Sequence, residues 1–277
     1  MQREFLAPTT PSSADNNNSN YSSINVRTHE TNINHVVPTL LSKSNKYKLF
    51  ASEYAGMVAF ITLSLSNVAI FGLMPSNMSW EGVAISWGFN LLFGIKIASY
   101  GNGYLNPCIA FCDYALGHSI NLCEFSIYVL AEILGAFTGA AITYGIHRNL
   151  YLNNNELTQD NTSVCGYFAT YPYEGVNKFQ AFVVEFLGTM LFAMSIFKIL
   201  KSKTPHAAYA ISMSLTAVTL ALGFQTAFSY NWARDFGPRV FITMVEPDCF
   251  TKKDNYWFVP LLANFLGATV GWLVAQL

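Results

Sequence analysis

Apolar residues in this chain gather into six long windows separated by short polar segments. A hydrocarbon core about 30 Å thick requires about 20 mostly apolar residues for each helical span, and few charged residues fall inside these windows. The pattern therefore predicts six membrane-spanning helices, at residues 50–73, 80–100, 123–147, 179–200, 206–228 and 256–277.

Two further segments, residues 106–116 and 231–244, are apolar or amphipathic and too short to cross a bilayer. Backbone that does not form a full span is tolerated at membrane depth only where it is buried in protein or lines a water-filled cavity. We therefore expect two re-entrant half-helices that line a pore or a binding cavity.

The two halves of the chain repeat one another. Residues 53–56 (Glu-Tyr-Ala-Gly) recur 132 residues later as residues 185–188 (Glu-Phe-Leu-Gly). Each half holds three spans and one half-helix, and because three is odd the second copy enters the membrane inverted, which places a site at the midplane. The prediction is an all-α membrane protein with six spans and two half-helices in an inverted repeat, whose repeats cover about residues 50–147 and 179–277.

Composition supports a membrane protein. Only 11% of the 277 residues are charged and 52% are hydrophobic, at a mean hydropathy of +0.30, whereas an ordinary soluble domain has about 25% charged residues. The formal net charge of −1 does not provide the basic face that a nucleic-acid binder needs. We expect lipid, and no nucleic acid, as a partner.

Residues 1–49 are polar and rich in Asn, Ser and Thr, which predicts a disordered tail ahead of a channel domain at residues 50–277. The positive-inside rule places this tail and the C-terminus in the cytoplasm, and we expect a plasma-membrane protein. The lysines that decide this orientation are Lys43, Lys46, Lys48, Lys198, Lys201 and Lys203.

The sequence leaves two features undecided, one at its C-terminal end and one in the loop between the halves. The sequence ends at Leu277 inside the sixth span, so a truncated C-terminus is one interpretation. Asn161 begins an Asn-Thr-Ser glycosylation motif in the loop between the halves, although chance occurrence is the alternative.

The carboxylates of Glu53, Glu132 and Glu185 fall inside predicted spans. Carboxylates are costly in a membrane and are usually functional or internally paired. We expect them to accept hydrogen bonds from the backbone of the re-entrant loops. Proton coupling is the alternative, but no basic or histidine partner lies at matching depth.

Each half-helix begins with an asparagine in a cap position, Asn106 before Pro107 and Asn231 in the second copy. If the caps meet near the midplane, each helix dipole contributes about +0.5 charge there, and the amides can donate hydrogen bonds to a passing solute. Cations and protons would be repelled, whereas a neutral polar solute would pass.

The motifs resemble those of the aquaporin family, over the whole segment from Phe50 to the end of the chain. The resemblance implies a passive channel, a homotetramer with one pore in each subunit, and neither catalytic residues, metal nor cofactor. The family's paired Asn-Pro-Ala signatures take the forms Asn106-Pro107-Cys108 and Asn231-Trp232-Ala233.

The glycerol-conducting branch of that family resembles this chain at further positions. Trp87 and Phe228 match its aromatic constriction, and the helical rise of about 1.5 Å per residue brings Arg234 to their depth. Two aromatic faces would take the carbon edge of glycerol, and the guanidinium would take its hydroxyl edge. Anchoring at the membrane interface is the alternative for the aromatic pair. Other branch-specific positions are Asp235, Arg239, Pro260 and Leu261.

Four positions depart from the family's pattern. Trp232 replaces a proline and could block the midplane. Thr219 replaces a frequent glycine and could narrow the constriction toward water. Tyr104 stands where histidine is common, and Cys108 could expose a thiol to the pore.

The main hypothesis is therefore a passive channel for glycerol and other small neutral polyols, and also for water. A chiefly water-selective channel and a poorly conducting protein are the alternatives, with a proton-coupled transporter less favoured. No enzyme motif is found, and the five cysteines show no zinc-binding spacing. Cys165 and Cys249 fall in predicted outer loops and could pair, but spacing alone leaves this open.

Overall fold

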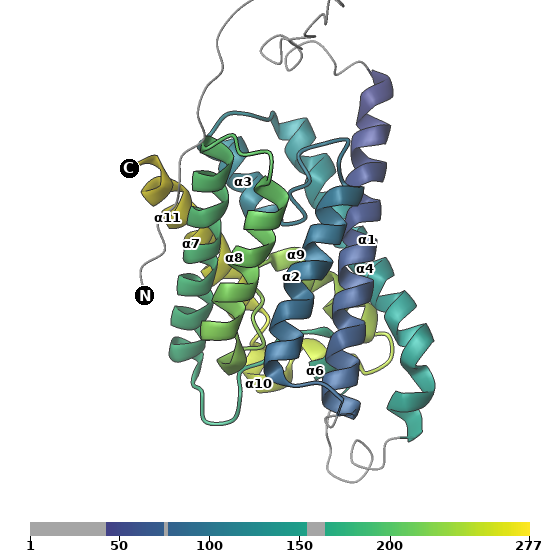
Figure 1. Ribbon diagram of the computed structural model, residues 1–277. Helices are drawn as coiled ribbons and strands as arrows, with labels where there is room; N and C mark the ends of the chain where they lie inside the picture. Colours follow the sequence, from purple (N-terminus) through teal and green to yellow (C-terminus); the bar gives the residue numbers. More distant parts are fainter. Residues whose placement is uncertain (1–42, 75–76, 154–163) are drawn as a thin grey trace, which may run out of the picture. The chain divides into compact units, whose positions relative to one another are not determined.

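The computed structural model describes residues 43–74, 77–153 and 164–277, which form a bundle of long helices (Figure 1). Most of the predicted tail and the glycosylation motif at Asn161 lie outside these residues. The described residues contain no strand, which confirms the all-α prediction. The long elements are α1 (Lys43–Leu73), α2 (Trp80–Ile97), α4 (Leu122–Asn153), α7 (Lys178–Lys201), α8 (Ala207–Leu222) and α11 (Phe258–Gln276).

Two short helices occupy the places of the predicted half-helices, α3 (Pro107–Ala115) and α9 (Trp232–Ile242). They confirm the expected architecture of six long helices and two half-helices. The smaller elements are α6 (Cys165–Phe168), η2 (Gly223–Gln225), η3 (Pro247–Phe250) and α10 (Lys252–Asn255).

Five of the long helices are long and apolar enough to cross a membrane, at Lys46–Leu73, Leu122–Leu152, Lys178–Lys201, Ala207–Gln225 and Phe258–Gln276. The remaining long helix, α2, corresponds to the second predicted span; it does not meet that criterion and carries Glu81 and Lys96 near its ends. It nevertheless runs along the bundle beside α1 and α8 (Figure 1).

Three predicted boundaries were wrong. Helix α1 begins at Lys43, so the last residues of the predicted tail are helical, and α4 continues past His147 to Asn153. Helix α8 ends at Leu222 rather than at Phe228. Phe228 has a φ of 42°, in the left-handed region that an α-helix cannot contain, so it lies in the loop before α9.

The two halves pack in the same way. Helix α4 packs along α1 in the first half, and α11 packs along α7 in the second. Each half-helix also reaches across to the other half, since α9 packs on α4 and α3 packs on α11. These contacts hold the two repeats together around the half-helix ends.

The bundle has two end faces, and each is named for a feature that it carries. Helix α1 begins and α11 ends at the amino-terminal face, whereas α6 and α10 lie at the opposite end (Figure 1). That second end carries a disulfide between Cys165 and Cys249, and we call it the disulfide face.

Candidate functional site

The site begins where the two half-helices start. Asn106 and Asn231 have nearly identical backbone angles, with φ and ψ of −158° and 112° in the first and −157° and 111° in the second. Each side-chain oxygen caps its own helix, by accepting hydrogen bonds from the amides of Cys108 at 3.0 Å and Ala233 at 3.1 Å. The repeat seen in the sequence is therefore also a repeat in local geometry.

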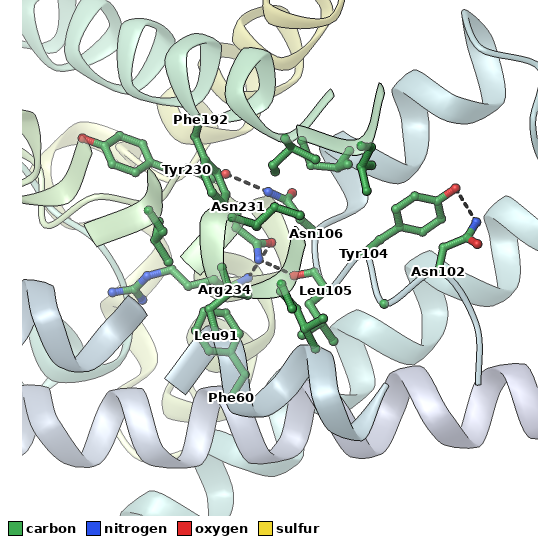
Figure 2. A pocket seen from close by; sticks show the side chains of 18 of the residues that line it. Phe60, Leu91, Asn102, Tyr104, Leu105, Asn106, Phe192, Tyr230, Asn231 and Arg234 are labelled. Carbon is green, nitrogen blue, oxygen red and sulfur yellow. Dashed lines mark hydrogen bonds between the residues drawn. The ribbon is translucent and has the colours of Figure 1, made fainter. Parts of the chain in front are cut away.

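The side-chain amides of these asparagines tie the half-helices together (Figure 2). Asn106 Nδ2 donates to the carbonyl oxygen of Tyr230 at 2.9 Å, and Asn231 Nδ2 donates to that of Leu105 at 2.5 Å. An amide NH₂ group has two hydrogens, and each contact uses one. Both asparagines line the central cavity, so the second hydrogen can serve a solute.

Glu53 and Glu132 hold the loop that precedes α3. Glu53 Oε1 accepts the amide of Leu105 at 2.5 Å, and Glu132 Oε1 accepts the amide of Asn106 at 2.9 Å. Both carboxylates are fully buried. Leu105 has a φ of 50°, a conformation that costs a non-glycine residue about 1 kcal/mol or more, and these bonds help to stabilise it.

Glu185 does the same for the loop that precedes α9. Its two oxygens accept the amides of Ser229 at 2.9 Å and Tyr230 at 3.1 Å. Tyr230 mirrors Leu105, with a φ of 47°. One turn after Glu185, a Cβ at Gly188 would lie 2.1 Å from the Tyr230 ring, so only glycine permits this approach. The repeated Glu-x-x-Gly motif thus positions a loop in both halves.

A buried polar chain that the sequence analysis missed supports the second loop further. Thr189 Oγ1 donates to Asn264 Oδ1 at 3.0 Å, and Asn264 Nδ2 donates to Ser229 Oγ at 2.9 Å. Ser229 Oγ in turn donates to the carbonyl oxygen of Asn231 at 3.1 Å. The available signal was Asn264, an amide inside an otherwise apolar span.

Arg234, Trp87 and Phe228 come together at one level of the bundle. The guanidinium carbon of Arg234 lies 4.4 Å from the centroid of the Trp87 ring and 5.5 Å from that of Phe228, and the two rings meet edge to face at 4.8 Å. Contacts of this kind are favourable when the cation is desolvated. All three side chains are buried, which does not fit an anchoring role for the aromatic pair at the membrane interface.

Backbone carbonyls also hold the Arg234 guanidinium. Its Nη1 donates to Phe168 at 3.3 Å and its Nη2 to Ala227 at 3.5 Å. Among the described residues no carboxylate forms an ion pair with it. A deep positive charge without such a partner gives this level a positive potential.

Asp235 and Arg239 stabilise the structure around the site rather than line it. They form a buried ion pair at 2.9 Å. Asp235 also accepts hydrogen bonds from the amide and hydroxyl of Thr170 at 2.6 Å, and Arg239 donates to the carbonyl of Cys249 at 2.8 Å. The pair fixes α9 to both loops of the disulfide face.

Those two loops are joined covalently by the bond between Cys165 and Cys249, whose Cα atoms are 5.6 Å apart. Glu246 lies close enough to complete a three-ligand cluster with the two sulfurs. Because both sulfurs belong to the disulfide, they are not available as thiolates for a metal.

Several predicted site residues lie outside the cavity wall. Trp232 packs against Phe236, with ring centroids 4.9 Å apart, and against Phe265 at 6.0 Å. The other predicted pore and branch-specific residues outside the lining are Pro107, Cys108, Thr219, Ala233 and Pro260, which are buried, and Leu261, which is partly buried.

The cavity itself has a volume of about 510 Å³. Its polar wall includes Arg234, Asn231, Asn106 and Tyr104, and its apolar wall includes residues such as Phe192. Figure 2 shows Arg234 at one end, Asn102 and Tyr104 at the other, and the two asparagines between them. A solute with both carbon and hydroxyl surface matches such a wall.

Two half-helices meeting end to end beside a cavity, within an inverted repeat of apolar helices, define a multi-pass membrane protein of the channel class. The chain belongs to the major intrinsic protein family, whose sequence profile matches residues 40–274. Members of this family are passive channels and not enzymes.

Individual relatives agree with this assignment. Aquaglyceroporin-2 of Rhizophagus irregularis is 30% identical over 83% of this chain and 76% of its own length. Aquaporin-1 of Rhizopus delemar is 31% identical over 81% and 77%, and Aquaporin-7 of Mus musculus is 28% identical over 86% and 82%. The X-ray structure of the aquaglyceroporin from Plasmodium falciparum shares the fold, with a TM-score of 0.73 at 23% identity over 82% of this chain and 94% of that one.

Proposed function

We propose that this protein is a passive channel for glycerol and other small neutral polyols, and that water also passes through it. The observation that carries the proposal is the group of Trp87, Phe228 and Arg234, in which two aromatic faces meet one guanidinium. Aromatic faces suit the carbon edge of a polyol, and the guanidinium donates to its hydroxyl groups. Relatives named aquaglyceroporin support the same solute class.

Exclusion of protons and other cations is part of the proposal. The N-termini of α3 and α9 meet near the middle of the bundle, and each contributes a partial positive charge. Arg234 adds a full positive charge at a second level of the same passage. A cation would have to shed water at both levels without gaining a compensating anion.

A chiefly water-selective channel is the second candidate. The observation that favours it is the close stacking of Arg234 on Trp87, at 4.4 Å, which leaves a polyol little room unless the guanidinium moves aside. A poorly conducting protein has less support, because the indole of Trp232 packs on Phe236 and Phe265 and not into the cavity.

The orientation proposed is that both termini lie in the cytoplasm of a plasma-membrane protein. A disulfide persists in oxidising compartments, so the disulfide face would be the outer one. The lysines at the end of α7, Lys198 and Lys201, lie at the opposite face, in agreement with the positive-inside rule. Protease accessibility of a tag at the N-terminus in intact and permeabilised cells tests this orientation.

Stopped-flow measurements on reconstituted vesicles test the solute. In an inward glycerol gradient the vesicles are expected to shrink and then reswell faster than empty vesicles do. Fast shrinking without faster reswelling would instead support the water-selective candidate. A homotetramer is proposed from the resemblance to the family, and the mass of the detergent-solubilised particle tests it.

A further inference from the structure

A second polar cluster lines the cavity on the side of the asparagines that faces away from Arg234 (Figure 2). It consists of Asn102 and Tyr104, in the loop after α2, and Asp113 on α3. Asn102 Nδ2 donates to the Tyr104 hydroxyl at 2.6 Å, and that hydroxyl donates to Asp113 Oδ2 at 2.6 Å. The three side chains thus form one chain of hydrogen bonds that ends on a carboxylate.

Packing holds this chain in place. The rings of Tyr104 and Tyr128 meet edge to face at 4.7 Å. The Tyr128 hydroxyl accepts the backbone amide of Asn102 at 3.1 Å. The ring of Tyr104 is therefore held by Tyr128, and the Tyr104 hydroxyl orients the carboxylate of Asp113 through its hydrogen bond.

The Asp113 carboxylate has hydrogen-bond acceptor positions that Tyr104 does not occupy. An ionised carboxylate has two oxygens with about four acceptor positions, and Tyr104 occupies one of them, on Oδ2. The amide of Ser119 donates to the main-chain oxygen of Asp113 and not to its side chain. Oδ1 can accept a hydrogen bond from a solute.

The lining around the cluster is mostly apolar, with Ser119 as a further polar residue. Among the described residues that line the cavity, Asp113 is the one acidic side chain and Arg234 the one basic side chain. The lining on the way to the amino-terminal face also includes Ile95, Ile196 and Leu200. A solute at this end therefore finds both a charged acceptor and hydrocarbon in the lining.

We propose that Asn102, Tyr104 and Asp113 form a binding site for the hydroxyl groups of neutral polyols at the amino-terminal end of the passage. The proposal rests on the polyol-channel function. Hydroxyl groups donate to the Asp113 carboxylate, in hydrogen bonds that its charge strengthens, while the carbon edge lies against the isoleucine and leucine side chains. Water has no carbon edge and gains less from the site, so the site favours polyol over water.

The experiment compares Asp113→Asn and Tyr104→Phe with the wild type in reconstituted vesicles, and measures glycerol and water permeability on the same preparation. Tyr114→Phe is the matched control, because Tyr114 neighbours Asp113 on α3 but stacks on Phe125 at 5.1 Å and does not line the cavity. Below saturation, the ratio of glycerol to water permeability is expected to fall about tenfold in Asp113→Asn, as loss of a charged hydrogen bond predicts. Tyr104→Phe is expected to lower it severalfold, and the control keeps the wild-type ratio.

Each outcome decides something. If the wild type conducts glycerol and both variants keep its permeability ratio, the site is wrong and the channel function stands. If the wild type conducts water but no glycerol, the proposed function falls and the site falls with it. Should Asp113→Asn yield no folded channel, Tyr104→Phe decides alone, because it leaves the carboxylate and the ring in place.

Discussion

At the scale of one residue, Trp232 shows that a residue's place along the backbone does not specify the direction of its side chain. Its backbone occupies the first turn of α9, where the family has proline, while its indole packs outward on Phe236 and Phe265. The sequence predicted the backbone position correctly, but the concern about a blocked midplane assumed an inward side chain. Nothing in a single sequence specifies that direction.

Replacing Trp232 with proline is accordingly expected to leave glycerol and water flux within about twofold of the wild type, because proline fits the first helical turn and opens no space in the cavity. Vesicle flux normalised to reconstituted protein measures this. A rise of tenfold or more would contradict the structure and restore the idea of an occluding indole.

In the proposed channel, the exclusion of protons and other cations is expected to depend on Arg234, whose guanidinium is buried beside Trp87. Arg234→Ala is expected to raise proton conductance by on the order of tenfold or more, because a charge in a low-dielectric passage is worth several kcal/mol. A pH-sensitive dye inside the vesicles measures the leak. Arg148→Ala serves as the control, since Arg148 is exposed at the end of α4. Unchanged proton conductance in Arg234→Ala would show that the guanidinium does not exclude protons.

At the scale of elements, the loops before α3 and α9 decide whether the half-helices meet, and buried carboxylates position both. The sequence allowed this contact to be predicted, since a carboxylate in an apolar span must find donors. It did not reveal the Thr189, Asn264 and Ser229 chain, because hydroxyl and amide groups in a span also bond locally to their own helix. The end of α8 was missed because the apolar pattern continues past Leu222 into the loop.

The loop contacts of Glu185 lead to a stability prediction. Glu185→Gln replaces one of two accepting oxygens with a donor that faces a backbone amide, and it is expected to cost about 2 kcal/mol. The thermal unfolding midpoint of the solubilised protein should fall. Glu81→Gln is the control, because Glu81 is exposed at the start of α2. Equal midpoints for the two variants would show that the loop does not depend on this carboxylate.

The disulfide also acts between elements, because it joins two loops of the disulfide face. Peptide mass analysis without reductant is expected to find Cys165 linked to Cys249, while the three other cysteines react with an alkylating reagent after unfolding. Recovery of all five cysteines as alkylated thiols would contradict the pairing. Spacing in the sequence left this pair open, because only the fold brings residues 84 positions apart to a Cα distance of 5.6 Å.

At the scale of the whole molecule, the inverted repeat brings two half-helices together, and a cavity lies beside their junction. The fold class could be predicted because the repeat, the apolar windows and the paired asparagines all indicate the same architecture. The lining of this cavity could be predicted only in part. Trp87, Phe228 and Arg234 do meet, whereas Thr219 lies outside the lining, because a residue's place in an alignment does not specify which face of its helix it occupies.

The central claim is that this passage conducts small neutral polyols, and glycerol reswelling of reconstituted vesicles tests it most directly. Vesicles with the protein are expected to reswell at least about tenfold faster than protein-free vesicles, as a passage that replaces the hydration of the solute allows. Reswelling at the rate of protein-free vesicles, in a preparation whose water permeability proves the channel folded, would contradict the claim.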